Sequence, residues 1–147
     1  ILDADLIVLG PGDLYTSVLA NCVVDGVSDA IKHSTAKVVY VSNLMTRCGQ
    51  TSNMGVAEHV AEISRYIERH PDYVIVNTAP FPAELIKRYE EDGECPVVFN
   101  YESNTSVIIP GDFLAAEEVR TATGDVLKRS LIRHDPRKLA RKLMDIL

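Results

Sequence analysis

Short apolar runs alternate with longer segments of mixed polarity along the chain. The strongest runs predict buried strands at residues 5–9, 37–42, 73–77 and 96–100. Weaker strand patterns occupy residues 106–110 and 125–129. Because the strong runs are apolar at nearly every position, we expect both faces of each strand to be covered.

The segments between these runs have helical spacing. The clearest one covers residues 55–70, where apolar side chains recur at intervals of four, three and four: Val56, Val60, Ile63 and Ile67. Further helices are predicted at residues 14–22, 28–32, 82–92 and 136–147. Asp13, Ser28 and Asp135 stand at the expected N-caps of three of these helices.

Strands that alternate with helices predict a single α/β domain, in which helices cover both faces of a parallel sheet. Ligands of such sheets bind beyond the carboxyl ends of the strands. Three loops leave those ends, at residues 10–12, 43–53 and 77–82. No internal repeat or interdomain linker interrupts the pattern.

The first of these loops, Gly10-Pro11-Gly12, connects a predicted strand to a predicted helix. Glycines let a ligand approach the backbone, and a helix N-terminus favours anions. Hydroxyl groups follow on Tyr15, Thr16 and Ser17. However, the turn matches neither the GxGxxG pattern nor the P-loop pattern, and the Asp13 carboxylate repels a phosphate unless a cation intervenes. A ligand-lining turn and a purely structural turn both stay open.

The loop after the second strand, NLMTRCGQT, is the richest polar segment of the chain. Asn43 stands where the strand ends, and its amide can donate and accept hydrogen bonds, which suits a base edge or a sugar. Thr46 adds a neutral hydroxyl group. Polarity alone is typical of any surface loop, but the position at the carboxyl end of a strand favours binding.

The composition is that of a globular protein, with 46% hydrophobic and 24% charged residues. A formal net charge of −6 argues against a nucleic-acid partner. No apolar run approaches the roughly 20 residues of a membrane span, and no signal-peptide pattern is found. Three cysteines without a CxxC pair fit a reducing cytosol.

The titratable residues form no recognisable catalytic set, whether a Ser-His-Asp triad, a nucleophile elbow or a close carboxylate pair. His59 shares the apolar stripe of its helix, which favours a buried core histidine, and its EHVAE context is not the HExxH zinc motif. Arg133 precedes the last helix, where its guanidinium can clamp a phosphate. From the residues alone, an ordinary surface arginine is the simpler interpretation.

Several segments together resemble one family. Residues 3–17 (DADLIVLGPGDLYTS) are similar to the AD-x-IVLGPGSLYTS stretch of the YvcK-like gluconeogenesis factors, which are relatives of the phospholactate transferase CofD. Residues 43–60 (NLMTRCGQTSNMGVAEHV) resemble the NLMTQPGET…DHV stretch of that family. Residues 133–147 resemble its ending, an RHD followed by a helix. The chain is identified as the C-terminal portion of a member of this group, also called UPF0052.

The resemblance implies a Rossmann-like three-layer α/β sandwich and a cytoplasmic bacterial protein. It also implies a longer chain, with a glycine-rich phosphate loop in a preceding half. YvcK-like members are associated with cell shape and with growth on gluconeogenic carbon sources, and they bind UDP-N-acetylglucosamine-type nucleotide sugars or pyridine nucleotides such as NAD(P). CofD-like members transfer a phospholactyl group to a deazaflavin with a divalent metal such as Mg²⁺.

The resemblance assigns ligand-binding roles to Gly10, Gly12, Tyr15, Thr16, Ser17, Asn43 and Arg133, and the polar loop adds Thr46 as a further ligand-binding candidate. It assigns no catalytic residue and no metal ligand. Arg47 and Cys48 replace a Gln-Pro of the family, and Gln50 replaces a Glu. Three functions therefore stay open: a nucleotide-binding regulator, a phospholactate transferase, and an interaction domain with a degenerate pocket. A homo-oligomer is one alternative for the assembly.

Overall fold

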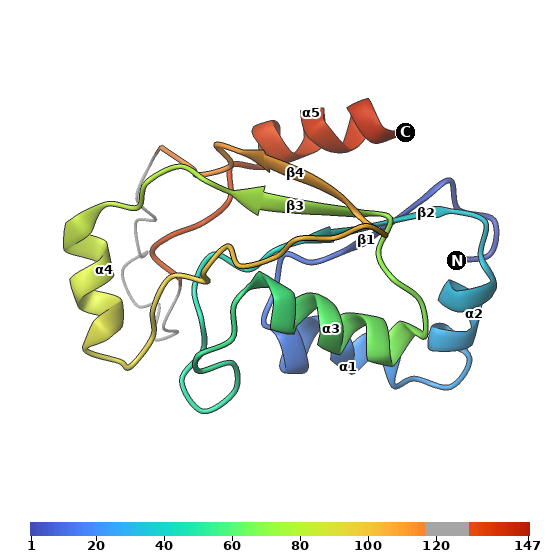
Figure 1. Ribbon diagram of the computed structural model, residues 1–147, viewed down its shortest axis with the longest axis horizontal. Helices are drawn as coiled ribbons and strands as arrows, with labels where there is room; N and C mark the ends of the chain where they lie inside the picture. Colours follow the sequence, from blue (N-terminus) through green and yellow to red (C-terminus); the bar gives the residue numbers. More distant parts are fainter. Residues whose placement is uncertain (117–129) are drawn as a thin grey trace, which may run out of the picture.

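A four-stranded parallel sheet forms the centre of the molecule (Figure 1). The structure is a computed structural model, and it describes residues 1–116 and 130–147. The strands are β1 (Leu6–Leu9), β2 (Lys37–Val41), β3 (Tyr73–Asn77) and β4 (Val107–Gly111), and they lie side by side in that order. Since every adjacent pair is parallel, all the carboxyl ends reach the same edge of the sheet.

Helices cover both faces of this sheet (Figure 1). One face carries a π-helical segment η1 (Leu14–Leu19) together with α1 (Ala20–Cys22), α2 (Val27–His33) and α3 (Val56–Ile67). The other face carries α5 (Pro136–Ile146), while α4 (Ala83–Glu90) lies beyond the carboxyl edge. The prediction of an α/β fold, with a parallel sheet between helices, is confirmed.

Burial on both faces explains the unbroken apolar runs. Alternate side chains of a strand point to opposite faces. In β2, Val38 and Tyr40 pack in the core beneath α3, whereas Val39 and Val41 pack against α5. All of these β2 side chains are fully buried, at 0% exposure. A strand in this position has no solvent-facing side, so a polar residue at any of these positions would be destabilising.

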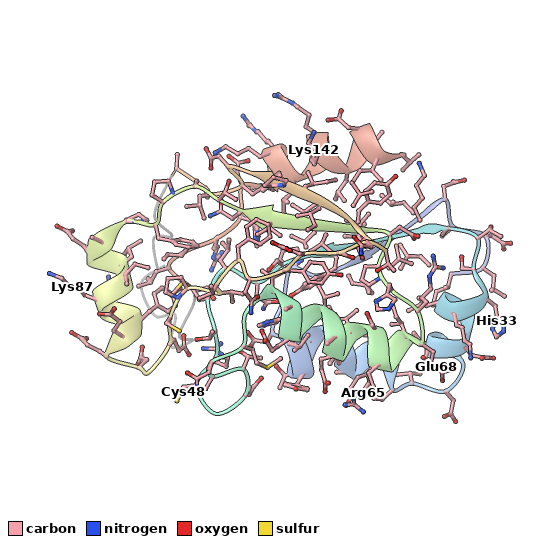
Figure 2. The ribbon with its side chains drawn as sticks, viewed as in Figure 1. His33, Cys48, Arg65, Glu68, Lys87 and Lys142 are labelled. Atoms are coloured by element: carbon pink, nitrogen blue, oxygen red, sulfur yellow. The ribbon has the colours of Figure 1, made fainter. Side chains whose placement is uncertain are left out.

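The helix predicted most clearly from its spacing is α3. Its apolar stripe is buried along the whole length: Val56, Val60, Ile63 and Ile67. The helix ends three residues earlier than expected, where Glu68 adopts a left-handed conformation with φ 52°. The cap of α5 is confirmed, because the Asp135 carboxylate accepts hydrogen bonds from the backbone N–H groups of Arg137 at 2.8 Å and Lys138 at 3.1 Å. The polar face of α5, which carries Lys142, is turned away from the sheet (Figure 2).

The fourth strand is not where the strongest pattern predicted it. Residues 96–100 are outside the sheet, and the weaker run at 106–110 supplies β4 instead. Residues 95–97 run antiparallel to residues 44–46: Val97 donates its N–H to Leu44 at 3.0 Å, and Thr46 donates to Cys95 at 2.7 Å. This crossing satisfies the backbone of the apolar run without a place in the sheet. The strand predicted at residues 125–129 lies outside the described residues.

Of the other two predicted helix caps, Asp13 stands at the N-cap position but does not cap through its side chain, and Ser28 is not an N-cap. Asp13 precedes η1 but makes no side-chain cap hydrogen bond, because its carboxylate is turned towards Arg47. Ser28 lies inside α2, which begins after Gly26, and its hydroxyl group donates to the carbonyl oxygen of Tyr66. In both cases the side chain forms a hydrogen bond with a residue distant in the sequence instead of capping the helix.

Candidate functional site

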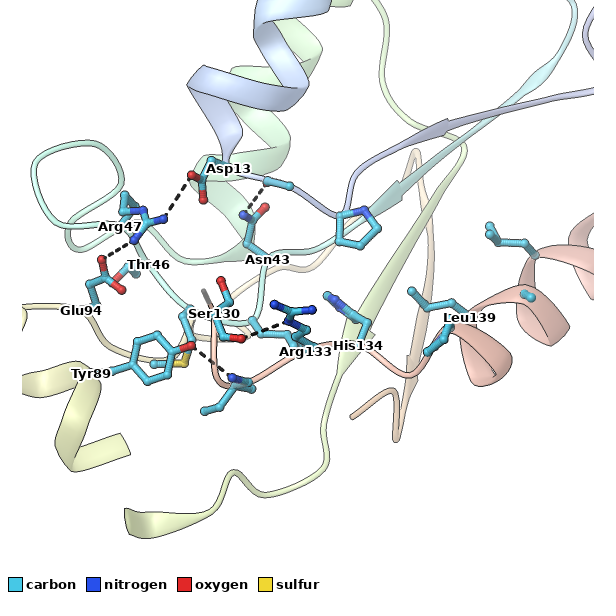
Figure 3. A pocket seen from close by; sticks show the side chains of 18 residues that line it. Asp13, Asn43, Thr46, Arg47, Tyr89, Glu94, Ser130, Arg133, His134 and Leu139 are labelled. Carbon is cyan, nitrogen blue, oxygen red and sulfur yellow. Dashed lines mark hydrogen bonds and ion pairs between the residues drawn. The ribbon is translucent and has the colours of Figure 1, made fainter. Parts of the chain in front are cut away.

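A pocket of about 580 Å³ opens at the carboxyl edge of the sheet (Figure 3). Its walls come from the turn after β1, the loop after β2, the segment that follows α4, residues 130–134 and one side of α5. These segments are distant in the sequence, and the parallel sheet brings them together. The position agrees with the general rule for ligand sites in parallel α/β sheets.

The turn after β1 depends on glycine. Gly10 has a φ of 87°, which side chains rarely adopt, and a Cβ atom there would lie 3.0 Å from the carbonyl oxygen of Val41. Gly10 therefore packs against the end of β2 and does not line the pocket. Pro11, Gly12 and Asp13 form the pocket wall at this turn.

Asn43 joins the ends of β1 and β2. Its Nδ2 donates a hydrogen bond to the carbonyl oxygen of Gly12 at 2.8 Å, and its Oδ1 accepts one from the hydroxyl group of Tyr40 at 2.9 Å. Burial raises the pKa of Tyr40, so this hydroxyl group stays protonated as a donor. An amide carries two N–H groups and two acceptor lone pairs, so one of each is left for a ligand. Asn43 thus holds the pocket wall in place and also lines it.

Thr46 lines the pocket as well, but its hydroxyl group already has an internal partner. Its Oγ1 accepts a hydrogen bond from the N–H group of Cys95 at 2.9 Å, and its side chain is buried. Thr46 therefore fixes the antiparallel crossing of the two segments and places its neighbour Arg47.

Arg47 bridges two carboxylates at one end of the pocket (Figure 3). Its guanidinium donates to Glu94 at 3.0 Å and to Asp13 at 3.3 Å. The Glu94 side chain is only 7% exposed, whereas those of Arg47 and Asp13 are 38% and 39% exposed. The hydrogen bond that Arg47 donates to Glu94, with the charges of both acids, raises the pKa of Arg47 despite partial burial, so the cluster holds a permanent positive charge between two acids.

Arg133 lies in the middle of the pocket, between Asn43 and His134 in the view of Figure 3. It is exposed, and its Nε donates to the carbonyl oxygen of Ser130 at 3.0 Å. Within residues 1–116 and 130–147 it makes no ion pair. Among these described residues, nothing competes with an anion from solution for its terminal amino groups.

His134 is the titratable neighbour of Arg133. Burial lowers its pKa from 6.5 to about 4, and a hydrogen bond with the backbone of Ser42 opposes this shift only in part. The imidazole is therefore neutral near pH 7. In that state the ring offers one donor and one acceptor and adds no charge beside Arg133.

Tyr89 positions the segment that carries Arg133. Its hydroxyl group accepts hydrogen bonds from the backbone N–H groups of Leu131 at 2.9 Å and Ile132 at 3.1 Å. The ring is buried in a cluster with Leu44 and Leu85. A side chain of α4 thereby fixes one wall of the pocket.

The remaining residues of the predicted site lie elsewhere. Tyr15 points to the α3 side, where its hydroxyl group donates to Glu62 at 3.3 Å. Desolvation, aided by the Glu62 charge, raises the pKa of Tyr15. Thr16 and Ser17 are exposed on η1 and do not line the pocket. The structure thus brings Gly12, Asn43, Thr46 and Arg133 together and separates the three hydroxyl residues from them.

Outside this pocket, His59 is the fully buried histidine of the α3 stripe. Its Nδ1 donates to the carbonyl oxygen of Gly55 at 2.7 Å, whereas its Nε2 has no partner within the described part of the chain. Burial lowers the pKa of His59, so the ring is neutral. This is the core histidine that the spacing predicted, satisfied at one nitrogen.

Among the residues that the structure describes, no three His, Cys, Asp or Glu side chains are grouped in a way that could hold a metal ion. In the same residues, no helix is long and apolar enough to cross a membrane.

The chain is similar to known proteins over most of its length. A sequence model of the family described as 2-phospho-L-lactate transferase CofD matches residues 1–114. A putative gluconeogenesis factor of Thermotoga maritima is 44% identical over 137 residues, which make up 93% of this chain and 42% of that protein. The gluconeogenesis factor of Bacillus subtilis is 34% identical over 148 residues, which make up 100% of this chain and 44% of that protein.

Known structures agree with this relationship. A crystal structure of a UPF0052-family protein from Bacillus halodurans superposes with a TM-score of 0.81 and 29% identity, over 97% of this chain and 44% of that one. The chain therefore belongs to the CofD/UPF0052 family, and the resemblance found in its sequence motifs is confirmed. It spans less than half the length of these relatives.

Proposed function

We propose that the pocket binds a phosphorylated nucleotide ligand, of the UDP-N-acetylglucosamine or NAD(P) type. The observation that carries this proposal is the convergence of Gly12, Asn43 and Arg133 on one pocket at the carboxyl edge of the sheet. Arg133 supplies a guanidinium for a phosphate, and Asn43 supplies an amide for a sugar or base. A volume of about 580 Å³ is in the range of small-molecule sites.

The protein acts, in this proposal, as a regulator of growth on gluconeogenic carbon sources and of cell shape in the bacterial cytoplasm. The name gluconeogenesis factor, carried by several relatives, supports the metabolic part. A binding protein also agrees with a pocket in which the titratable neighbour of Arg133, His134, is neutral and the lining residues that the structure describes pair no nucleophile with a base.

Transferase activity is the second candidate function, favoured by the family description as phospholactate transferase. A transferase of this kind joins a phospholactyl group to a deazaflavin and uses a divalent metal ion. Product formation from a deazaflavin, nucleotide-activated phospholactate and Mg²⁺ would support it. If the full-length protein shows no turnover but binds the nucleotide, the regulator is favoured.

Isothermal titration of the full-length protein with UDP-N-acetylglucosamine, and separately with NAD⁺, tests the binding proposal. Arg133→Ala and Asn43→Ala are each expected to weaken binding by about 1–3 kcal/mol, because each removes a polar partner that the ligand would otherwise bury. Arg137→Ala is the matched control, since Arg137 is exposed at the start of α5 and does not line the pocket.

Two results would contradict the binding proposal. Binding that survives both substitutions places the ligand elsewhere. The absence of saturable binding to any of these nucleotides would favour the third alternative, an interaction domain with a degenerate pocket.

A further inference from the structure

The two ends of the pocket differ in charge and polarity. At one end lie Asp13, Arg47 and Glu94, and at the other the apolar side chains of α5, including Leu139 and Leu143 (Figure 3). Arg133 lies between these ends. The pocket therefore has three sections of different chemistry. A ligand whose three parts match these sections would bind in a single orientation.

The end formed by Asp13, Arg47 and Glu94 has an excess of negative charge. Two carboxylates share one guanidinium there, at 3.3 Å and 3.0 Å. An anionic ligand group would have to compete with a carboxylate for Arg47 while lying beside the other carboxylate. Arg133 offers an anion a guanidinium whose contact in the described residues is the carbonyl oxygen of Ser130. Phosphate groups are thus favoured at Arg133 and disfavoured at Arg47.

The same end is well suited to uncharged polar groups. A carboxylate accepts hydrogen bonds from sugar hydroxyl groups and from an amide N–H, and a guanidinium donates to hydroxyl and carbonyl oxygens. Asp13 and Arg47 are accessible, at 39% and 38% side-chain exposure, whereas Glu94 is buried and holds Arg47 in place. The cluster therefore presents both acceptors and donors at fixed positions.

We propose that the Asp13–Arg47–Glu94 cluster is the sugar subsite of the pocket and selects the uncharged sugar of a nucleoside diphosphate sugar over an acidic sugar. The diphosphate then lies at Arg133 and the base lies against the apolar wall of α5. This inference rests on the proposed function, because it presupposes that the pocket holds a nucleotide. It adds the orientation of the ligand and the residues that set its specificity.

Two ligands that differ in the charge of the sugar test the proposal: UDP-N-acetylglucosamine, whose sugar is neutral, and UDP-glucuronate, whose sugar carries a carboxylate at C6, with UDP as the common part. The full-length protein is expected to bind UDP-glucuronate about tenfold or more weakly than UDP-N-acetylglucosamine, because like charges meet at Asp13. Asp13→Asn removes one negative charge and is expected to bring the two affinities within about threefold. Dividing one affinity by the other cancels any general weakening of nucleotide binding.

The control is Asp25→Asn, which makes the same change of net charge on the exposed turn before α2 and leaves the ratio as in the unmodified protein. If Asp13→Asn does not fold, Glu94→Gln tests the same charge from the opposite side of Arg47. Equal affinities for both UDP-sugars in the unmodified protein would overturn the sugar subsite, and so would an affinity ratio that Asp13→Asn leaves unchanged. If UDP still binds in these cases, the proposed function stands. Failure to bind UDP itself would overturn both.

Discussion

The side-chain amide of Asn43 donates a hydrogen bond to the carbonyl oxygen of Gly12 at 2.8 Å, and so fastens the loop after β2 to the turn after β1. The same amide accepts a hydrogen bond from the buried Tyr40 hydroxyl group. A residue that lines the pocket is thereby also a structural support. Binding and stability are coupled at this position, and they have to be measured together.

Asn43→Ala is expected to lower the free energy of unfolding by about 1–3 kcal/mol, because it leaves the Tyr40 hydroxyl group without its acceptor in a fully buried position. Urea denaturation measures this loss. Asn21→Ala, at an exposed position of α1, is the control, with a change of about 0.5 kcal/mol or less. Equal effects for the two substitutions would mean that the link between the two loops contributes nothing to stability.

Gly10→Ala is expected to destabilise the fold by about 2 kcal/mol, because a left-handed backbone and a crowded Cβ position act together. The added carbon would lie 3.0 Å from the carbonyl oxygen of Val41. Gly26→Ala is a matched control: Gly26 has a similar φ of 81°, but its Cβ would meet nothing within 4 Å. Thermal unfolding of the two variants separates the backbone cost from the steric cost, and an equal loss of stability would rule out the steric part.

Arg47 and Glu94 are expected to be energetically coupled. Arg47→Gln leaves a carboxylate that is 7% exposed without its guanidinium. The losses of stability caused by the two single substitutions are therefore expected to add up to more than the loss caused by the double substitution. A double-mutant cycle with Glu94→Gln is expected to give a coupling energy of about 1–3 kcal/mol. The exposed pair Lys142–Asp145 is the reference, with about 0.5 kcal/mol or less. A similar value for both pairs would contradict the role of burial.

His134 makes stability depend on pH in the acid range. Its pKa is lowered from 6.5 to about 4 in the folded protein, so the unfolded chain takes up the proton first as the pH falls. The free energy of unfolding is therefore expected to decrease between about pH 6.5 and pH 4, and His59 acts in the same direction because burial lowers its pKa also.

His134→Gln should flatten this dependence in denaturant titrations at several pH values. Asn21→Ala, an exposed substitution that removes no titratable group, should leave the slope unchanged. A slope that is the same in both variants would show that His134 stays solvated in the folded protein.

The sequence predicted the elements whose pattern reflects burial directly. The run at β2 and the stripe of α3 are apolar because both are enclosed, and each was found at nearly its observed bounds. The sequence pattern did not determine which later segment forms the fourth strand. The run at residues 96–100 is the stronger pattern and that at 106–110 the weaker, but which one pairs with β3 depends on the path of the chain after α4.

The site was predicted where a residue stands at the end of a strand, as Asn43 and Gly12 do. Arg133 came from the family resemblance, since its place beside the loop after β2 depends on the packing of residues 130–134. The roles of Arg47 and Glu94 were missed, because only the antiparallel crossing of two distant segments brings them together. Tyr15 lies apart from this pocket because the turn of η1 directs it to Glu62 on α3.

The ion pair between Arg47 and Glu94 also has a consequence for sequence divergence. The two residues are 47 positions apart, but neither is free to change alone, because a buried carboxylate without its countercharge is costly. A lineage that replaces the arginine is expected to have lost the acid as well. An alignment of many relatives should therefore show these two positions varying as a pair, and each such pair would identify a chain whose pocket carries a different charge.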